Sequence, residues 1–494
     1  MSKKPFGIRF VCVAALALCA AAPAAAQQPD ASPYGNAGPY GNLFRGAGKP
    51  QPQSLDIRGG LFGGYDDNLL AQAPDSGQTN PFDPRFQVPG ITSGFNSSAT
   101  YSYSHASRAK SASQFRFGGT AALQEFTGAD KKPFWVHNYN AGSAFSTNLT
   151  PKISFMGNLQ ASYAPYYQYV PFLTNGASSS VSVPSTVPAD GTAADTGAGA
   201  GAPVVAANPV DPTFNPSGSD VGFATESRFV GTLSVGASIT DSFTKRASIT
   251  AEGHLTETGV FGQSQARVED RLARGVISYK VTRKVGVHAG YGIQDVRYVQ
   301  DESPNARLQN HLIDFGIDYG DGGSFTFARY YNFSFGTGVS ALRNGDQTYF
   351  RVDGNATLTR RLGRTWAASV GAARGTSYIV GFTVPIFTDS VNAGVGGQLG
   401  QRVQLSAGAN YARGQSAFDS SAGTLVSRSA STRLTLAISQ HLGMYGQYSY
   451  YQYDVPNGFF TTVAFTQHQH RRSASIGLTF WLPLINQPTA RPQQ

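Results

Sequence analysis

Charged side chains recur at positions where they could steer a solute. They fall on the smaller, more polar side of segments in which apolar and polar residues alternate: Arg116, Arg246, Glu252, Asp314, Asp318, Arg351, Asp353, Arg402 and Arg433. A row of such groups can line a conduit for a polar or charged solute. The same row can also be a solvated ladder that stiffens a wall, and the sequence alone favours neither interpretation.

Two short motifs offer metal ligands. His468 and His470 are two residues apart, which places both imidazoles on one face of a strand. We favour a polar rim over a metal site there. Asp66, Asp67 and Asn68 could bind calcium, but they lack the spaced series of oxygen ligands of a dedicated loop, and turn chemistry explains Asp and Asn equally well. We therefore predict neither a metal nor a cofactor.

Motifs of the common enzyme classes are absent from the sequence. There is no Gly-x-Ser-x-Gly elbow, His-Glu-x-x-His helix, phosphate loop or dinucleotide fingerprint. We predict that the chain is not an enzyme. The minor alternative, a membrane-embedded hydrolase, would need Ser and His together on one rim, and labelling by a serine-reactive probe would reveal it.

The N-terminus is predicted to be an export signal over residues 1–26. Lys3, Lys4 and Arg9 precede an apolar run, and Ala24-Ala25-Ala26 forms a small-residue cleavage site. The run is shorter than the roughly 20 residues of a membrane anchor. Lipidation at Cys19 is disfavoured because the preceding residue is a leucine. The chain's 2 cysteines lie inside this segment, so the mature chain would form no disulfide.

The net charge argues against nucleic acid as a partner. The full chain carries 38 Lys and Arg against 29 Asp and Glu, and cleavage after residue 26 would remove Lys3, Lys4 and Arg9, leaving a charge of +6. These charges are spread thinly, without a basic block. Gly (57), Phe (32) and Tyr (24) are abundant, and no later segment is apolar enough for a transmembrane helix.

The elements that position the charged residues are predicted strands. Between Ser473 and Leu482, apolar residues alternate with Ser, Gly and Thr, which is the period of a strand. The same alternation begins at Leu55 and recurs along the chain. It is compatible with a soluble sandwich, but in a membrane it would require a closed barrel, since an open sheet edge cannot be satisfied in lipid.

Short turns separate these strands at regular intervals. From Val281 onward, turns near 320, 362, 399 and 442 follow one another at 37 to 43 residues, each interval holding two strands and a longer connection. Short turns on one side and long loops on the other are typical of outer-membrane barrels. Eight such turns, with both termini on one side, predict an all-β, antiparallel up-and-down transmembrane barrel of about 18 strands. A count of 16 stays open, and we expect irregular register at 267–274 and 325–333.

The last strand resembles the assembly signal of outer-membrane barrels, through Ser475, Gly477, Phe480 and Leu482. With the Tyr65-Asp66-Asp67-Asn68 motif and the repeated Leu/Phe-Thr/Gly-x-Lys/Arg turns, the chain from Leu55 resembles exported β-barrel porin families of proteobacteria, most closely barrels encoded with exopolysaccharide synthesis and export systems. The resemblance implies an outer-membrane location, contact with lipid and with the barrel-assembly machinery, and polysaccharide export components as partners. The tail after Leu482 and the insert at 170–220 depart from it.

The predicted organisation is a signal peptide (1–26), a disordered periplasmic leader (27–54), a barrel (55–482) with a long extracellular low-complexity loop (170–220), and a C-terminal tail (483–494). We expect passage of a polar solute, either a saccharide or a secreted polysaccharide. The alternative is a surface adhesin or structural barrel that acts through its loops. Tyr445, Tyr448, Tyr450, Tyr451 and Tyr453 are expected to form interface girdles.

Overall fold

The computed structural model describes most of the chain after the leader. The described residues are 53–67, 89–106, 112–128, 134–164, 229–261, 266–282, 285–300, 303–319, 325–327, 331–344, 346–362, 365–378, 384–418, 423–454, 456 and 468–487. The whole of the predicted loop at 170–220 and the whole of the signal segment lie outside this part of the chain.

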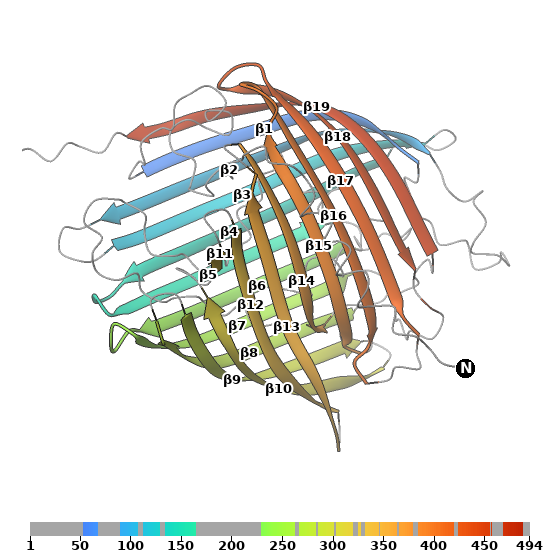
Figure 1. The fold of residues 1–494 in the computed structure, drawn as a ribbon. Helices are drawn as coiled ribbons and strands as arrows, with labels where there is room; N and C mark the ends of the chain where they lie inside the picture. The colour runs from blue at the N-terminus through green and yellow to red at the C-terminus, as the bar shows by residue number, and fades with distance from the viewer. Residues whose placement is uncertain are drawn as a thin grey trace, which may run out of the picture.

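The described residues form one antiparallel sheet (Figure 1). Its strands are β1 (Gln53–Asp66), β2 (Gly90–Ala106), β3 (Ala112–Gly128), β4 (Phe134–Asn148), β5 (Ile153–Ala164), β6 (Phe229–Asp241), β7 (Ala247–Phe261), β8 (Ala266–Lys280), β9 (Val285–Gln300), β10 (Ser303–Tyr319), β11 (Phe325–Phe327), β12 (Tyr331–Asn344), β13 (Gln347–Arg361), β14 (Trp366–Ser377), β15 (Ile386–Gln398), β16 (Val403–Ser416), β17 (Leu425–Ala437), β18 (Leu442–Asp454) and β19 (His468–Gln487).

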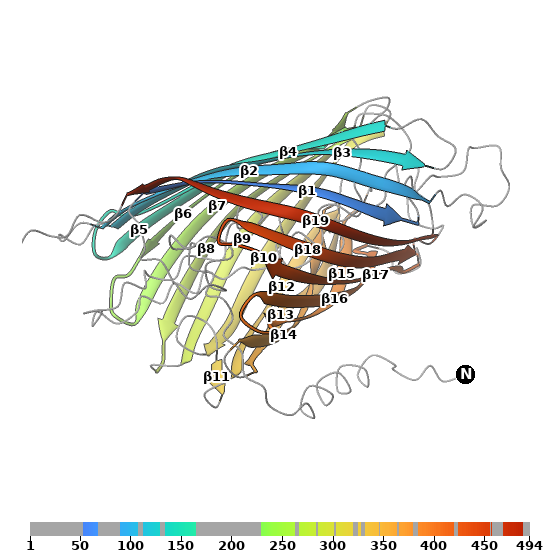
Figure 2. The same cartoon turned by 90° about the horizontal axis from the view of Figure 1, so that it is seen from above.

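The sheet closes on itself. Consecutive strands pair along the chain, and β1 pairs with both β2 and β19, between which it lies in Figure 2. The three-residue β11 and the much longer β10 both pair with β12, so they share one position in the wall. The barrel therefore has 18 strands, and the predicted all-β closed barrel is confirmed.

Hydroxyl side chains shape several short turns. In the β4–β5 turn, the Thr150 Oγ1 accepts hydrogen bonds from the backbone N–H of Lys152 (3.2 Å) and of Ile153 (3.0 Å). Thr244 does the same in the β6–β7 turn. A threonine that satisfies two turn amides explains why this residue recurs there. The turn predicted at Leu442 was wrong by a few residues: Ser439 caps it, and Leu442 already begins β18.

The two faces of the sheet differ in chemistry. On β9 and β10, the side chains that point outward are 45–57% exposed: Tyr291, Ile293, Ile313 and Phe315. Gln294, the next residue after Ile293, points inward and is buried. The pattern repeats around the wall, so the outer surface is a continuous apolar band. Soluble proteins rarely expose so large an apolar surface.

The two stretches expected to be irregular have different explanations. Residues 267–274 lie in regular β8, without a register shift against β7 or β9. The alternation is hidden in the sequence because β8 is charged on both faces there, with Arg271 outward and Arg274 inward. Residues 325–333 do contain a break, where the short β11 turns back into β12.

The ends of the barrel extend slightly beyond the predicted bounds. β1 begins at Gln53, and β19 continues past Leu482 to Gln487. The register between them shifts at Leu55/Asp56, opposite Pro483. Proline has no N–H to donate to the ladder, which accounts for an irregularity at this point.

A buried ion pair joins the first and last strands at the end opposite the termini. The Arg471 Nε donates to the Asp66 Oδ2 at 2.6 Å, and the Arg471 Nη2 contacts the same oxygen. Both side chains are at most 3% exposed. Beside them, the backbone N–H of Arg472 donates to the Asp67 Oδ1 at 2.6 Å. The Asp-Asp and Arg-Arg motifs, 405 residues apart, thus meet across the closing seam.

The substitution Asp66→Ala is expected to weaken this seam. It would leave the Arg471 guanidinium buried without its carboxylate, and breaking such a pair costs about 3 kcal/mol or more. Asp67→Ala is the matched control, because it removes one hydrogen bond, worth about 1 kcal/mol. The stability of both variants can be measured from gels of unboiled samples, as the urea concentration at which half of the fast-migrating, folded band is lost. Equal midpoints for the two variants would contradict a role of the ion pair in closure.

Candidate functional site in the barrel lumen

The structure places the nine predicted lumen residues in three groups. Arg116, Glu252, Asp314, Arg351, Asp353 and Arg433 lie in strands, on the face opposite the outward apolar side chains. Arg246 and Arg402 instead lie exposed in short turns, so their placement on the wall was wrong; each follows a turn Thr or Gly and precedes the first strand residue. Asp318 lies in β10 at the register position of Gly286, and its side chain is outside the described part of the structure.

A buried charge cluster spans four neighbouring strands. Arg274 of β8 donates to both carboxylate oxygens of Asp314, from Nε at 3.2 Å and from Nη2 at 2.6 Å, and to Glu252 from Nη1 at 3.1 Å. The His288 Nε2 lies 3.8 Å from the Asp314 Oδ2. The Arg274, Asp314 and His288 side chains are at most 3% exposed. One guanidinium therefore holds two carboxylates against the wall.

Glycines make room for this cluster on the inner face. A Cβ at Gly290 would collide with the Asp314 carboxylate, and one at Gly316 would collide with the His288 ring. At Gly292 it would lie 3.2 Å from the Arg274 Cβ. The charged side chains therefore lie flat over glycine positions of the adjacent strands. This packing explains part of the high glycine content and keeps the lumen clear of these long side chains.

Gly477, one of the predicted assembly-signal residues of β19, packs against an aromatic ring on the inner face. A Cβ at Gly477 would lie 2.6 Å from the Tyr445 ring, and the Arg433 guanidinium carbon lies 3.8 Å from the centre of that ring. Leu482 is 48% exposed and Phe480 half-buried. Gly477 thus has a local packing role, and recognition of Ser475 and the other signal residues by assembly machinery stays a prediction.

The tyrosine girdle proposed for β18 was partly wrong. Tyr445 and Tyr451 are only 8% and 5% exposed and point inward, whereas Tyr448 is 45% exposed and points outward. Tyrosines at even positions of β18 share the face of Tyr448. The strand period assigns odd and even positions to opposite faces, so a run of consecutive tyrosines cannot form one girdle.

The tip of the β14–β15 hairpin folds into the lumen. Pairing between β13 and β14 in the described chain runs only from Gly354 to Arg361 on β13. Beyond it, residues on both faces of the tip are buried, including Ser377 (3%) and Ile386 (0%). The Asn310 Nδ2 on the inner face of β10 donates to the Tyr378 hydroxyl at 3.3 Å. The tip therefore lies inside the wall formed by β10, β12 and β13.

Arg351 joins two inward-folded segments to the wall. Its Nε and Nη2 donate to the backbone oxygen of Ala417, after β16, at 3.1 Å and 2.6 Å. Its guanidinium carbon lies 5.5 Å from the centre of the Phe387 ring of the tip. Phe387 and Ala417 pack with Leu342 of β12 in one small apolar cluster. This contact narrows the lumen near the end opposite the termini.

Buried hydroxyls line the surface between the tip and the wall. Ser340 and Thr388 are at most 1% exposed. The Ser340 hydroxyl interacts with the Asp353 carboxylate, whereas the Thr388 hydroxyl makes no hydrogen bond among the described residues. A polar surface with unused hydrogen-bonding capacity suits water or a hydroxylated solute better than a permanently dry contact.

Sequence reasoning missed Arg274, His288 and the inward tip. Arg274 lies in the stretch where charges on both faces hide the strand period. The tip had a detectable signal: an apolar run from Tyr378 to Phe387 in a segment that should otherwise be a solvated loop.

Neither a metal site nor a membrane-spanning helix is found among the described residues. No group of three or more His, Cys, Asp or Glu side chains is placed to hold a metal, in the residues that the structure describes. No helix among these residues has the length and hydropathy needed to cross a membrane.

Comparisons with known proteins add little beyond the architecture. No protein-family model and no curated protein matches the chain. Similar solved structures include three from Pseudomonas aeruginosa: OpdQ (11% identity, TM-score 0.39, covering 88% of this chain and 100% of that chain), OccK7 (OpdD) (8%, 0.40, 88% and 99%) and the siderophore receptor PirA (10%, 0.35, 88% and 81%). Identities and TM-scores this low assign no function, and the barrel is established by its own strand pairing.

Proposed function

We propose that this chain spans the outer membrane and forms a channel for polar solutes. The observation that carries the proposal is the division of the closed sheet into an apolar outer face and a polar inner face. In lipid, only such a closed wall satisfies every backbone group of a strand protein, while its apolar exterior meets hydrocarbon. A polar lumen can then replace water around a passing solute.

The inner face favours an uncharged polar solute, and we propose a saccharide. The Arg274, Arg351 and Arg433 guanidinium groups are each held by partners in the wall or its inward segments. The Arg274 charge is offset by Asp314 and Glu252, and the Arg351 and Arg433 groups are held against the wall. Such an inner face makes a poor ion filter, whereas hydroxyls and amides between these groups can exchange hydrogen bonds with sugar hydroxyls. Passage of a secreted polysaccharide, with export components as partners, is the most specific form of this proposal.

Two recordings on refolded protein test the proposal. Planar-bilayer measurements should show discrete conductance steps with a reversal potential near zero in a KCl gradient, because the inner face carries charges of both signs. Proteoliposomes should swell in neutral sugar at least as fast as in a charged solute of similar size. Boiled, unfolded protein is the control for both.

Two outcomes would contradict the proposal in different ways. If neither the full chain nor a variant lacking 170–220 conducts, the channel is wrong. Conductance steps that are strongly selective for anions or cations would support a channel but contradict an uncharged solute.

A further inference from the structure

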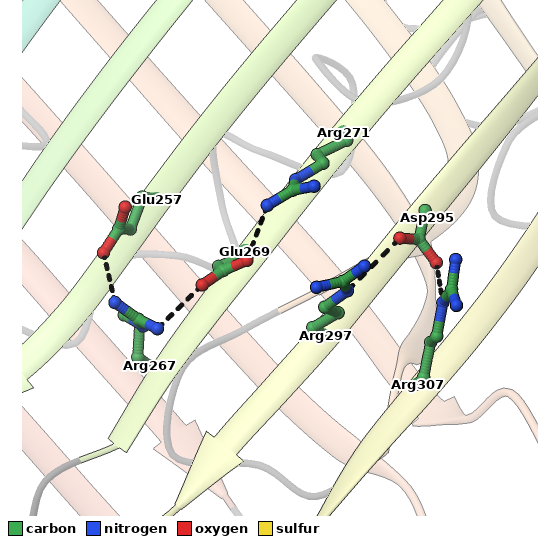
Figure 3. A network of polar contacts seen from close by, with 7 residues as sticks. All are labelled: Glu257, Arg267, Glu269, Arg271, Asp295, Arg297 and Arg307. Atoms are coloured by element: carbon green, nitrogen blue, oxygen red, sulfur yellow. Dashed lines mark hydrogen bonds and ion pairs between the residues drawn. The ribbon is translucent and has the colours of Figure 1, made fainter.

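A network of ion pairs covers the outward face of β7 to β10 at the end opposite the termini (Figure 3). It contains Glu257 of β7, Arg267, Glu269 and Arg271 of β8, Asp295 and Arg297 of β9, and Arg307 of β10. Four arginines against three carboxylates leave a net charge of +1. None of these residues takes part in the lumen site, since all seven lie on the face of the exposed apolar side chains.

The register places like charges directly opposite one another. Glu257 faces Glu269, and Arg297 faces Arg307. Such pairs are unfavourable unless a counter-charge lies between them. Arg267 bridges the glutamates, from Nη1 to Glu257 at 3.0 Å and from Nη2 to Glu269 at 2.8 Å.

Asp295 joins the two arginines through their Nε atoms. Its Oδ2 lies 3.4 Å from the Arg297 Nε, and its Oδ1 lies 2.6 Å from the Arg307 Nε. Among the described residues, the Nη atoms of both arginines make no ion pair, and the two side chains are 40% and 57% exposed. Asp295 therefore fixes two guanidinium groups side by side and leaves their terminal N–H groups available to an anion.

The pair lies directly beyond the apolar band. Ile293, two residues before Asp295 on the same face of β9, is 45% exposed, and Ile313 on β10 is 49% exposed. Arg297 lies four residues beyond Ile293 on the same face, which corresponds to about 13 Å along the strand. A strand tilt of about 40° reduces this to about 10 Å along the membrane normal. In a membrane that begins at these isoleucines, Arg297 and Arg307 lie at the level of the lipid headgroups rather than in water far above them.

We propose that Arg297 and Arg307 bind the phosphate of a phosphorylated lipid headgroup in the outer leaflet. Paired guanidinium groups present parallel N–H donors that match the geometry of phosphate oxygens. The acyl chains of the same lipid would pack on the apolar band below. The inference rests on the membrane location in the proposed function, but not on passage of any solute.

Retention of lipid by the purified barrel tests the site. Refolded protein is mixed in detergent micelles with phosphorylated lipid A, and bound lipid is quantified by native mass spectrometry. The double substitution R297Q/R307Q is expected to reduce binding about tenfold or more, since each basic residue near a charged headgroup contributes on the order of 1 kcal/mol. The matched control K245Q/R246Q removes the same charge from an exposed turn at the opposite end and should bind like the wild type.

Three results would overturn the site. They are equal binding by R297Q/R307Q and the wild type, equal binding of lipid A stripped of its phosphates, and full competition by inorganic phosphate at the same concentration as the lipid. The last would indicate a site for free phosphate rather than a headgroup. Unchanged gel migration of the unboiled variants verifies that the barrel has formed. Conductance is not the readout, so failure of this inference is distinguishable from failure of the channel.

Discussion

Replacing Arg274 by methionine is expected to lower the free energy of unfolding by about 3–5 kcal/mol, the largest effect of any single substitution in the wall. The methionine fills much of the volume, but the carboxylates of Asp314 and Glu252 lose their shared cation. Asp314 is 1% exposed, so water cannot replace the lost partner. The measurement is urea unfolding of the refolded protein in lipid vesicles, followed by tryptophan fluorescence.

Arg271→Met is the control for this effect. Arg271 lies three residues away on the same strand, but it points outward, is 52% exposed and has a single surface ion pair, with Glu269 at 3.1 Å. Removing such a pair costs about 1 kcal/mol or less. If both variants unfolded at the same urea concentration, the buried cluster would not stabilise the barrel. The triple variant E252Q/R274M/D314N should recover part of the loss, because it leaves no unpaired charge.

Arg351→Ala is expected to change the current through the proposed channel more than any other substitution. It removes both hydrogen bonds to the Ala417 oxygen and the contact with the Phe387 ring. Hydrogen bonds from a charged donor contribute roughly 1.5–3 kcal/mol. The backbone N–H of Ala417 donates to the Pro385 oxygen of the tip at 2.9 Å, so the population in which the Ala417 segment and the tip are displaced together should rise by about ten- to a hundredfold. Single-channel recordings should show frequent visits to a level of larger conductance.

Arg374→Ala provides the matched comparison for the tip. The Arg374 guanidinium carbon lies 5.7 Å from the centre of the same Phe387 ring, but the residue is on the outward side and is paired with Asp389. Its loss should leave the dwell times of the conducting levels unchanged. Equal behaviour of the two variants would show that Arg351 does not restrain the tip.

The architecture was largely predictable because strand period and turn spacing are local signals. Apolar residues alternate in register with the wall, so the faces of strands such as β19 could be assigned from the sequence. The count of 18 followed from the short turns, which carry Thr or Gly for reasons of turn geometry. Where the period is carried by charges on both faces, as around Arg271 and Arg274, the same signal disappears.

The lumen site was less predictable because its contacts are not local. Six predicted residues do lie on the inner face, but nothing in the sequence pairs Arg274 with Asp314, 40 residues away. Likewise, Arg351 lies in β13 and Ala417 directly follows β16, and these two strands are not neighbours in the wall. Turn residues such as Arg402 were misplaced because an error of one residue in a predicted strand boundary moves a side chain from the inner face to a solvent-exposed turn.

The limited pairing between β13 and β14 has a mechanical consequence. A barrel in which all neighbouring strands are fully paired has a fixed circumference. Widening it in a membrane would require breaking backbone hydrogen bonds in hydrocarbon. Here the hairpin tip shares no ladder with the strand that overlaps it, since pairing stops at Gly354. Displacing the tip therefore breaks no ladder between β13 and β14. In the proposed channel, the width of the lumen can then change while the strand pairing of the wall is kept.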